Sequence, residues 1–185
     1  MTLPEFFAWD PEDASVRLWQ LIDGEPVAMA PATESHGALQ MEIGRLLGNH
    51  LLARGGPCRV ISDAGIIPRV RSDRNYRIPD LGVTCAPPSS GVMVPEPILL
   101  IEILSPSNEI ETWANIWAYT TIPSVVEILI VSSTKIDAEL LRRRDDGSWP
   151  ETPDRIGPDG DVTLASVEYA VPLMDFYRTT ALASG

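Results

Sequence analysis

The feature that most constrains the fold is an apolar run, Pro97–Leu104, that a single acidic residue, Glu102, interrupts. Consecutive aliphatic residues of this kind are typical of a strand that is buried on both faces of a sheet. An ionised carboxylate in such a strand is costly unless it is paired with a cation, hydrogen-bonded or bound to a metal. We therefore expect a layered sheet protein in which Glu102 has a specific partner.

The residues before this run predict one long helix followed by strands. Leucine and isoleucine recur at helical spacing over residues 35–54, where Thr33 or Ser35 can cap the start and Gly55 begins a Gly-Gly-Pro stop. Strand-like runs follow at residues 58–68, 76–85 and 97–104. The connections between them are short and rich in turn-forming residues, which favours an antiparallel meander.

The residues after the run predict a crossover. Ile110, Trp113, Ala114 and Trp117 fall at helical spacing within residues 108–121, and we expect the two tryptophans to pack against the sheet. An apolar strand at residues 125–131 follows, and a strand, a helix and a strand in this order favour parallel pairing of the two strands.

The rest of the chain predicts a strand at 138–144, an acidic loop at 145–161 and a β-like run at 162–171. The expected class is α/β or α+β, with a mixed sheet that combines an antiparallel meander, a crossover helix and a parallel strand. We expect one domain over residues 1–185, since the chain has the length of a single domain and no linker or repeat.

Composition limits the partners and the compartment. The net charge is −12, and Lys135 is the single lysine, which disfavours DNA binding through a broad positive field. Cys58 and Cys85 lack a C-x-x-C arrangement, which argues against structural zinc and against a disulfide scaffold. With no export signal and no membrane-length apolar run, these observations favour a cytoplasmic protein that does not enter the membrane.

A second carboxylate gives Glu102 a chemical interpretation. Asp80 also lies inside a strand-like pattern, and pairing of the two strands would place it beside Glu102. Two carboxylates, together with water and a substrate phosphate, are a usual way to bind Mg²⁺. The alternative is that Glu102 forms an ion pair with a nearby arginine, for which the candidates are Arg69, Arg71 and Arg77.

Four segments in this order resemble the Uma-two restriction endonuclease family of the PD-(D/E)XK nuclease superfamily: LWQLIDGEPVAMAPATESHG, YRIPDLGV, LLIEILSPSNE and VPLMDFY. The resemblance implies a restriction-endonuclease-like core that hydrolyses DNA phosphodiester bonds with Mg²⁺ or Mn²⁺. It implies that Asp80 and Glu102 are metal ligands, with the backbone carbonyl of Ile103 as a third. It also implies a substrate-contacting or supporting role for His36 and Tyr119.

The sequence departs from that family pattern at the position of the catalytic lysine. The superfamily position two residues after the glutamate is Leu104, and the helical position that the family uses instead is Asn115. Asn115 can orient a water molecule but carries no charge. Gln20 replaces a further family glutamate.

Two functions therefore stay open. One is a metal-dependent endonuclease with weakened activity, in which Asp80, Glu102 and Asn115 are the catalytic residues. The other is a catalytically inactive binding or interaction protein. A homodimer is expected, because cutting the two strands of a duplex suits two-fold symmetry and two-fold dimers are the commonest oligomers.

Overall fold

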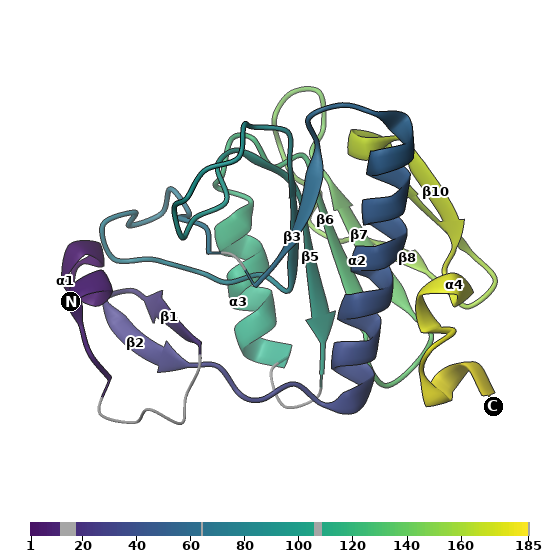
Figure 1. Cartoon of the computed structure of the whole chain (residues 1–185), viewed down its shortest axis with the longest axis horizontal. Helices are drawn as coiled ribbons and strands as arrows, with labels where there is room; N and C mark the ends of the chain where they lie inside the picture. The colour runs from purple at the N-terminus through teal and green to yellow at the C-terminus, as the bar shows by residue number, and fades with distance from the viewer. Residues whose placement is uncertain (12–17, 64, 106–108, 185) are drawn as a thin grey trace.

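The computed structural model describes residues 1–11, 18–63, 65–105 and 109–184. Its centre is a sheet in the order β3-β4-β5-β6-β7-β8, in which only the β5–β6 pair is parallel (Figure 1). The six strands are β3 (Arg59–Ser62), β4 (Leu81–Thr84), β5 (Pro97–Leu104), β6 (Glu127–Ser132), β7 (Ala138–Arg142) and β8 (Asp154–Ile156). The mixed sheet confirms the predicted class.

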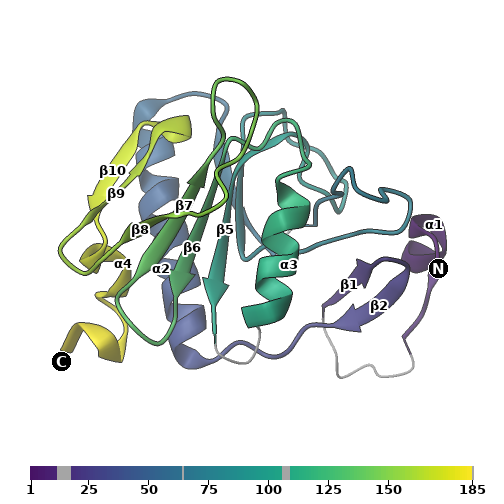
Figure 2. The ribbon, with the colours of Figure 1, turned by 180° about the vertical axis from the view of Figure 1, so that it is seen from behind.

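One long helix covers each face of this sheet. Helix α2 (Glu34–Arg54) packs through Leu39, Ile43 and Leu47 against the odd-numbered side chains of β5, such as Ile101. Helix α3 (Glu109–Tyr119) lies on the opposite face, as the view from behind shows (Figure 2). The side chains of β5 alternate between two cores, because successive residues of a strand point to opposite faces. Leu100 therefore joins the α3 core, and Glu102 points to that same side.

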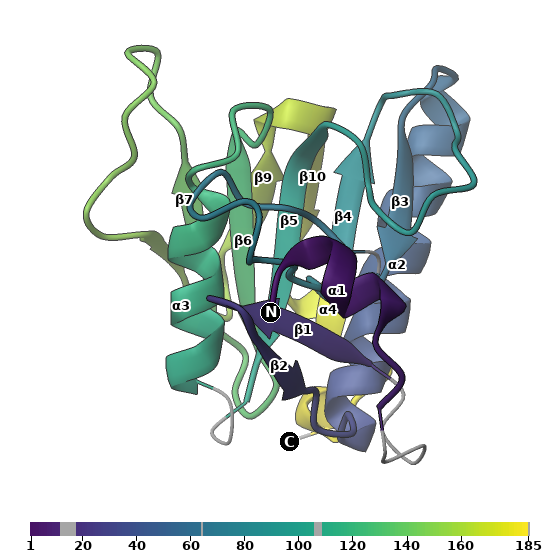
Figure 3. The same ribbon diagram turned by 90° about the vertical axis from the view of Figure 1, so that its left-hand side faces the viewer.

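The ends of the chain add two hairpins, one on each side of the molecule. The N-terminal part forms α1 (Leu3–Ala8) and the pair β1 (Trp19–Ile22) and β2 (Glu25–Ala28), which lie in front of the sheet in Figure 3. The C-terminal part forms β9 (Asp161–Leu164), β10 (Tyr169–Pro172) and α4 (Met174–Tyr177), with 3₁₀ turns at Ala165–Val167 and Ala181–Ser184. No helix in the described part of the chain is long and apolar enough to cross a membrane.

The long helix and the central strand match their predictions closely. Helix α2 begins after Thr33, whose hydroxyl oxygen accepts a hydrogen bond from the His36 amide, so Thr33 and not Ser35 is the cap. It ends at Gly55, whose φ of 63° is one that glycine adopts readily. The predicted strand at 97–104 is β5, and its parallel pairing with β6 confirms the crossover.

The two strands before β5 are shorter than predicted. Among the described residues of these two runs, Arg59–Ser62 and Leu81–Thr84 form regular strands, whereas Ile66, Tyr76 and Arg77 make isolated bridges. Pro79 lacks an N–H group and interrupts the second ladder just before Asp80. The chain bends away there, and Tyr76 pairs instead with Leu21 of β1.

The expectation that Trp113 and Trp117 pack together against the sheet is wrong in part. Trp113 is half-buried against the α3 core, but Trp117 is 43% exposed, and Ile110 and Ala114 face solvent. The buried face carries Thr112, Asn115, Ile116, Ala118 and Tyr119. The spacing of apolar residues predicted the wrong buried face for this helix. Polar side chains that have buried partners occupy part of the face that actually packs against the sheet.

The expectation against a disulfide is also corrected. Cys58 and Cys85 are joined by a disulfide that closes a sequence separation of 27 residues. The two cysteines flank the β3–β4 pair, in which Arg59 lies opposite Thr84, so the antiparallel register brings them face to face. This contact is set by tertiary pairing, which the spacing of cysteines alone does not reveal.

Candidate active site

The sheet register brings Asp80 and Glu102 together. In the antiparallel pair of β4 and β5, Leu81 lies opposite Ile101, and Asp80 is the residue just before β4. Extending that register by one position places Asp80 opposite Glu102. Both residues are buried, with 7% and 6% of their surface exposed. Two acids far apart in sequence are therefore neighbours in the interior of the molecule.

Asp80 is held from two directions. One carboxylate oxygen, Oδ1, lies 2.8 Å from Nε2 of His36, in the first turns of α2. The other oxygen, Oδ2, accepts a hydrogen bond of 2.6 Å from the backbone N–H of Ile103. The Asp80 carbonyl accepts a further bond from the Gln40 side chain, one turn further along α2. These contacts fix the carboxylate between the start of α2 and strand β5.

Glu102 is held by helix α3. The hydroxyl of Tyr119 donates a hydrogen bond of 2.5 Å to Oε1 of Glu102. Burial raises the pKa of Glu102 well above its ordinary value, and the negative charge of Asp80 raises it further. Burial and the neighbouring Glu102 charge also raise the pKa of Tyr119, which therefore remains a protonated donor at neutral pH. The two acids form an electrostatically unfavourable pair that a cation would relieve.

His36 partly compensates the negative charge of Asp80. Burial lowers the pKa of its imidazole, but the hydrogen bond to Asp80 and the charges of Asp80 and Asp63 outweigh burial and raise that pKa overall. His36 thus contacts Asp80 in the structure. The family resemblance predicted a supporting or substrate-contacting role for this residue.

Gln20, Asn115 and Arg77 form a second polar cluster on the α3 side. Arg77 donates from Nη1 to Oδ1 of Asn115 at 2.8 Å. Oε1 of Gln20 accepts a bond of 3.0 Å from the backbone N–H of Ile78 and lies 3.5 Å from Nδ2 of Asn115. Asn115 precedes Tyr119 by one helical turn, so this cluster adjoins the Tyr119–Glu102 contact.

Arg77 is the residue whose place sequence reasoning missed. The sequence suggested it only as one possible ion-pair partner of Glu102, along with Arg69 and Arg71. In the described part of the chain no arginine or lysine forms an ion pair with Glu102, and Arg71 pairs with Asp23 instead. The only sequence signal for Arg77 was its position three residues before Asp80, which does not show that its side chain turns toward helix α3.

The donor set fits a divalent cation through its chemistry. Asp80 and Glu102 supply hard, buried carboxylate oxygens of the kind that Mg²⁺ prefers. Among the described residues no group of three or more His, Cys, Asp or Glu side chains is placed to hold a metal, so further ligands would be water, main chain or substrate. Ile103 donates its backbone N–H to Asp80, so its main chain lies beside the Asp80 carboxylate.

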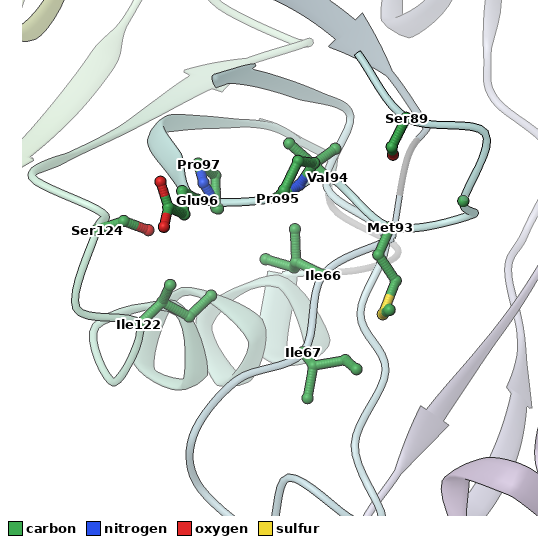
Figure 4. A pocket seen from close by; sticks show the side chains of 11 residues that line it. Ile66, Ile67, Ser89, Met93, Val94, Pro95, Glu96, Pro97, Ile122 and Ser124 are labelled. Carbon is green, nitrogen blue, oxygen red and sulfur yellow. The ribbon is translucent and has the colours of Figure 1, made fainter. Parts of the chain in front are cut away.

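A pocket lies away from these residues. It has a volume of about 400 Å³ and is lined mainly by aliphatic side chains and prolines, including Ile66, Val94, Pro95 and Ile122 (Figure 4). It opens at the amino end of β5, beside Glu96 and the end of α3, and none of the candidate site residues lines it. Its aliphatic walls lack the paired acids of the candidate active site.

The chain matches a known protein family. Residues 3–168 match the profile of the Uma2 family, which is described as "Putative restriction endonuclease". The chain belongs to the Uma2 family. The family resemblance is thereby confirmed, and three of its four segments lie within the matched residues, whereas VPLMDFY follows them.

The chain is also similar to one curated protein in sequence and to one solved structure in fold. The "Uncharacterized protein slr1290" of Synechocystis is 30% identical over 148 residues, which are 78% of this chain and 75% of that protein. A crystal structure of "a putative nuclease belonging to DUF820" from Anabaena variabilis has a TM-score of 0.78 and 16% identity. That similarity covers 96% of this chain and 97% of the other, and shows a shared fold.

In this Uma2 chain, neither expected lysine position carries a charge. Leu104 is half-buried and packs in the α3 core, and Asn115 is buried against Arg77. Lys135 pairs with Asp137 at 3.1 Å, just beyond β6, with its side chain largely exposed. The positive group closest to Asn115 among the described contacts is the guanidinium of Arg77.

Proposed function

We propose that this Uma2 chain is a divalent-metal-dependent DNA endonuclease that hydrolyses phosphodiester bonds, with reduced activity. The observation that carries the proposal is the placement of Asp80 opposite Glu102 in the buried end of the β4–β5 pair. Two such carboxylates would hold Mg²⁺ or Mn²⁺, with the Ile103 carbonyl as a further ligand. A bound ion there supplies a water of lowered pKa and neutralises charge on the phosphoryl group.

The other residues act by orientation. His36 and the Ile103 N–H hold the Asp80 carboxylate, and Tyr119 holds the Glu102 carboxylate. Asn115 orients a water molecule or a phosphate oxygen by hydrogen bonding, while Gln20 lies behind it. In the reaction a water oxygen forms a bond to phosphorus as one P–O ester bond breaks, and the departing oxygen gains a proton.

A plasmid cleavage assay tests this proposal. Wild-type protein with MgCl₂ or MnCl₂ is expected to nick or linearise DNA, and EDTA or Glu102→Gln should abolish the cleavage. Glu139→Gln is the matched control, because Glu139 lies on β7 in the same cross-sheet row as Glu102, separated from it by Ile130. Equal cleavage by wild type and Glu102→Gln would contradict the proposal.

A catalytically inactive binding protein is the second candidate, and specific features favour it. Leu104, Asn115 and Gln20 replace charged residues of the family pattern, and the net charge is −12. Loss of one preorganised electrostatic group costs about 100- to 1000-fold in rate. Metal binding without any cleavage would support this candidate, and cleavage gained by Asn115→Lys would identify the missing charge as the defect.

We also propose that the protein works as a homodimer, since a duplex presents two strands related by two-fold symmetry. Light scattering behind a size-exclusion column measures the mass directly. A mass near twice that of the chain is expected, whereas a monomer at all concentrations would contradict the proposal.

A further inference from the structure

The guanidinium of Arg77 is buried without an acidic partner. Only 5% of the residue is exposed, and its guanidinium donates hydrogen bonds to two amide oxygens, those of Asn115 at 2.8 Å and Asn75 at 3.0 Å. Within the described residues Nε of Arg77 has no hydrogen-bond partner, and no carboxylate lies within ion-pair distance of it. A buried charge with an unsatisfied donor is costly, and such groups are concentrated at functional sites.

The charge of Arg77 persists despite this burial. Burial lowers the pKa of Arg77, and the negative charge of Asp23 offsets only part of this effect. An arginine starts from so high a pKa that it stays protonated under ordinary conditions. The site therefore contains a fixed positive charge next to helix α3, on the side that carries Tyr119 and Glu102.

This charge acts on Asn115. Because Oδ1 of Asn115 accepts from Arg77, the amide nitrogen must point the other way, toward Gln20 at 3.5 Å. An amide whose oxygen is bound to a cation is polarised, so that its N–H groups become stronger donors. The nitrogen carries two hydrogens, and the long contact to Gln20 leaves donor capacity for a further acceptor.

We propose that Arg77 is a positioning residue that polarises Asn115 to bind a non-bridging oxygen of a phosphate ester. The proposal rests on the proposed function, because it assumes that the phosphate group lies over Asp80 and Glu102. Neither residue has this role alone, because Arg77 supplies the charge and Asn115 supplies the directed N–H group. Such preorganised donors are effective where water is excluded.

Moving the charge from residue 77 to residue 115 tests the proposal. Binding of a short fluorescein-labelled DNA duplex is measured by anisotropy in CaCl₂, beside cleavage in MnCl₂ and thermal unfolding of each variant. Arg77→Met is expected to weaken binding about 10-fold, the size of one charge-assisted hydrogen bond. The double variant Arg77→Met/Asn115→Lys is expected to recover binding to within about 3-fold of wild type, because it returns a cation to the cluster that Arg77 and Asn115 share.

Arg71→Met is the control for general loss of positive charge. Arg71 is an exposed arginine that pairs with Asp23, and its removal is expected to change binding less than about 2-fold. Rescue by the double variant separates a charge effect from a structural one, because a lysine at 115 cannot rebuild the Arg77–Asn75 bond. Where the manganese reaction proceeds, the kcat of Arg77→Met should fall more than its KM rises.

Each outcome supports or contradicts the proposed role of Arg77. Unchanged DNA binding by Arg77→Met, or a loss that the double variant does not rescue, overturns the role of Arg77 while leaving the metal site intact. Failure of wild type to bind either metal or DNA overturns the proposed function, and this inference falls with it. Loss in Arg77→Met with rescue by the relocated charge supports the inference even if no variant cleaves DNA.

Discussion

The hydroxyl of Tyr119 lies 2.5 Å from Oε1 of Glu102, so helix α3 is joined to the central strand at its only acidic residue. Tyr119 lies in the buried face of α3, and Glu102 lies in the row of β5 that faces it. This contact fixes the position of the Glu102 side chain relative to α3. The geometry of the site therefore depends on the packing of α3.

Tyr119→Phe removes that donor. We expect the free energy of unfolding to fall by about 1–3 kcal/mol, because the buried Glu102 side chain loses its hydrogen-bond donor. Metal affinity should fall about 10- to 100-fold, as is typical when a partner of a ligand is lost. Urea denaturation and calorimetric titration measure the two effects.

Tyr177→Phe is the matched control for that experiment. Tyr177 is buried on the α2 side of the sheet, and its hydroxyl donates to the carbonyl of Ser132 at 2.7 Å. Its loss should lower stability but leave metal affinity unchanged. A similar loss of metal affinity in both variants would show that the effect of Tyr119 is general destabilisation.

Acid sensitivity should depend on Glu42. Hydrogen bonds from Arg45 and from Arg178 outweigh burial and hold the pKa of Glu42 at about 2, below its ordinary 4.5. Because the folded pKa is depressed, this stabilisation is present above pH 4.5 and is lost as the pH falls toward 2. Glu42→Gln should therefore lose less stability over this range than wild type, by on the order of 2 kcal/mol.

Denaturant unfolding at several pH values between neutrality and acid measures this difference. Glu168→Gln is the control, because Glu168 forms an exposed, solvent-screened pair with Arg54 and its loss should change the acid profile much less than the loss of Glu42. Identical acid profiles for wild type and Glu42→Gln would contradict the assignment.

The disulfide should stabilise the β3–β4 edge of the sheet. The bond closes a loop with a sequence separation of 27 residues, which restricts the unfolded chain. On the chain-entropy account, reduction should lower the free energy of unfolding by about 3–4 kcal/mol. Unfolding with and without a reducing agent measures the effect, and the Cys58→Ser/Cys85→Ser variant should be insensitive to the reagent. Equal stability of the oxidised and reduced protein would show that the bond does not restrict the unfolded state.

Prediction from sequence succeeded where one residue pattern has one structural solution. The aliphatic run Pro97–Leu104 could only be a buried strand, and the capped, leucine-rich segment before it could only be a helix. Both patterns depend on residues that are close in the sequence, so they can be recognised without the tertiary structure. The pairing of Asp80 with Glu102 followed from treating two acids in neighbouring strands as one site.

The errors arose where tertiary contacts override local pattern. Helix α3 turns Asn115 and Tyr119 inward and Trp117 outward, because the polar pair has partners in Arg77 and Glu102. The Cys58–Cys85 bond depends on strand register. The short hairpin β1–β2 has no periodicity long enough to detect, although its Asp23–Gly24 turn has the positive φ angles typical of such hairpins.

The central claim is that Asp80 and Glu102 together bind one divalent cation. Calorimetric titration of MnCl₂ into wild type, Asp80→Asn/Glu102→Gln and the control Glu139→Gln tests it most directly. We expect one site per chain in wild type and in Glu139→Gln, and no measurable heat of binding in the double variant. Equal binding by wild type and the double variant, or no binding by any of the three, would contradict the account.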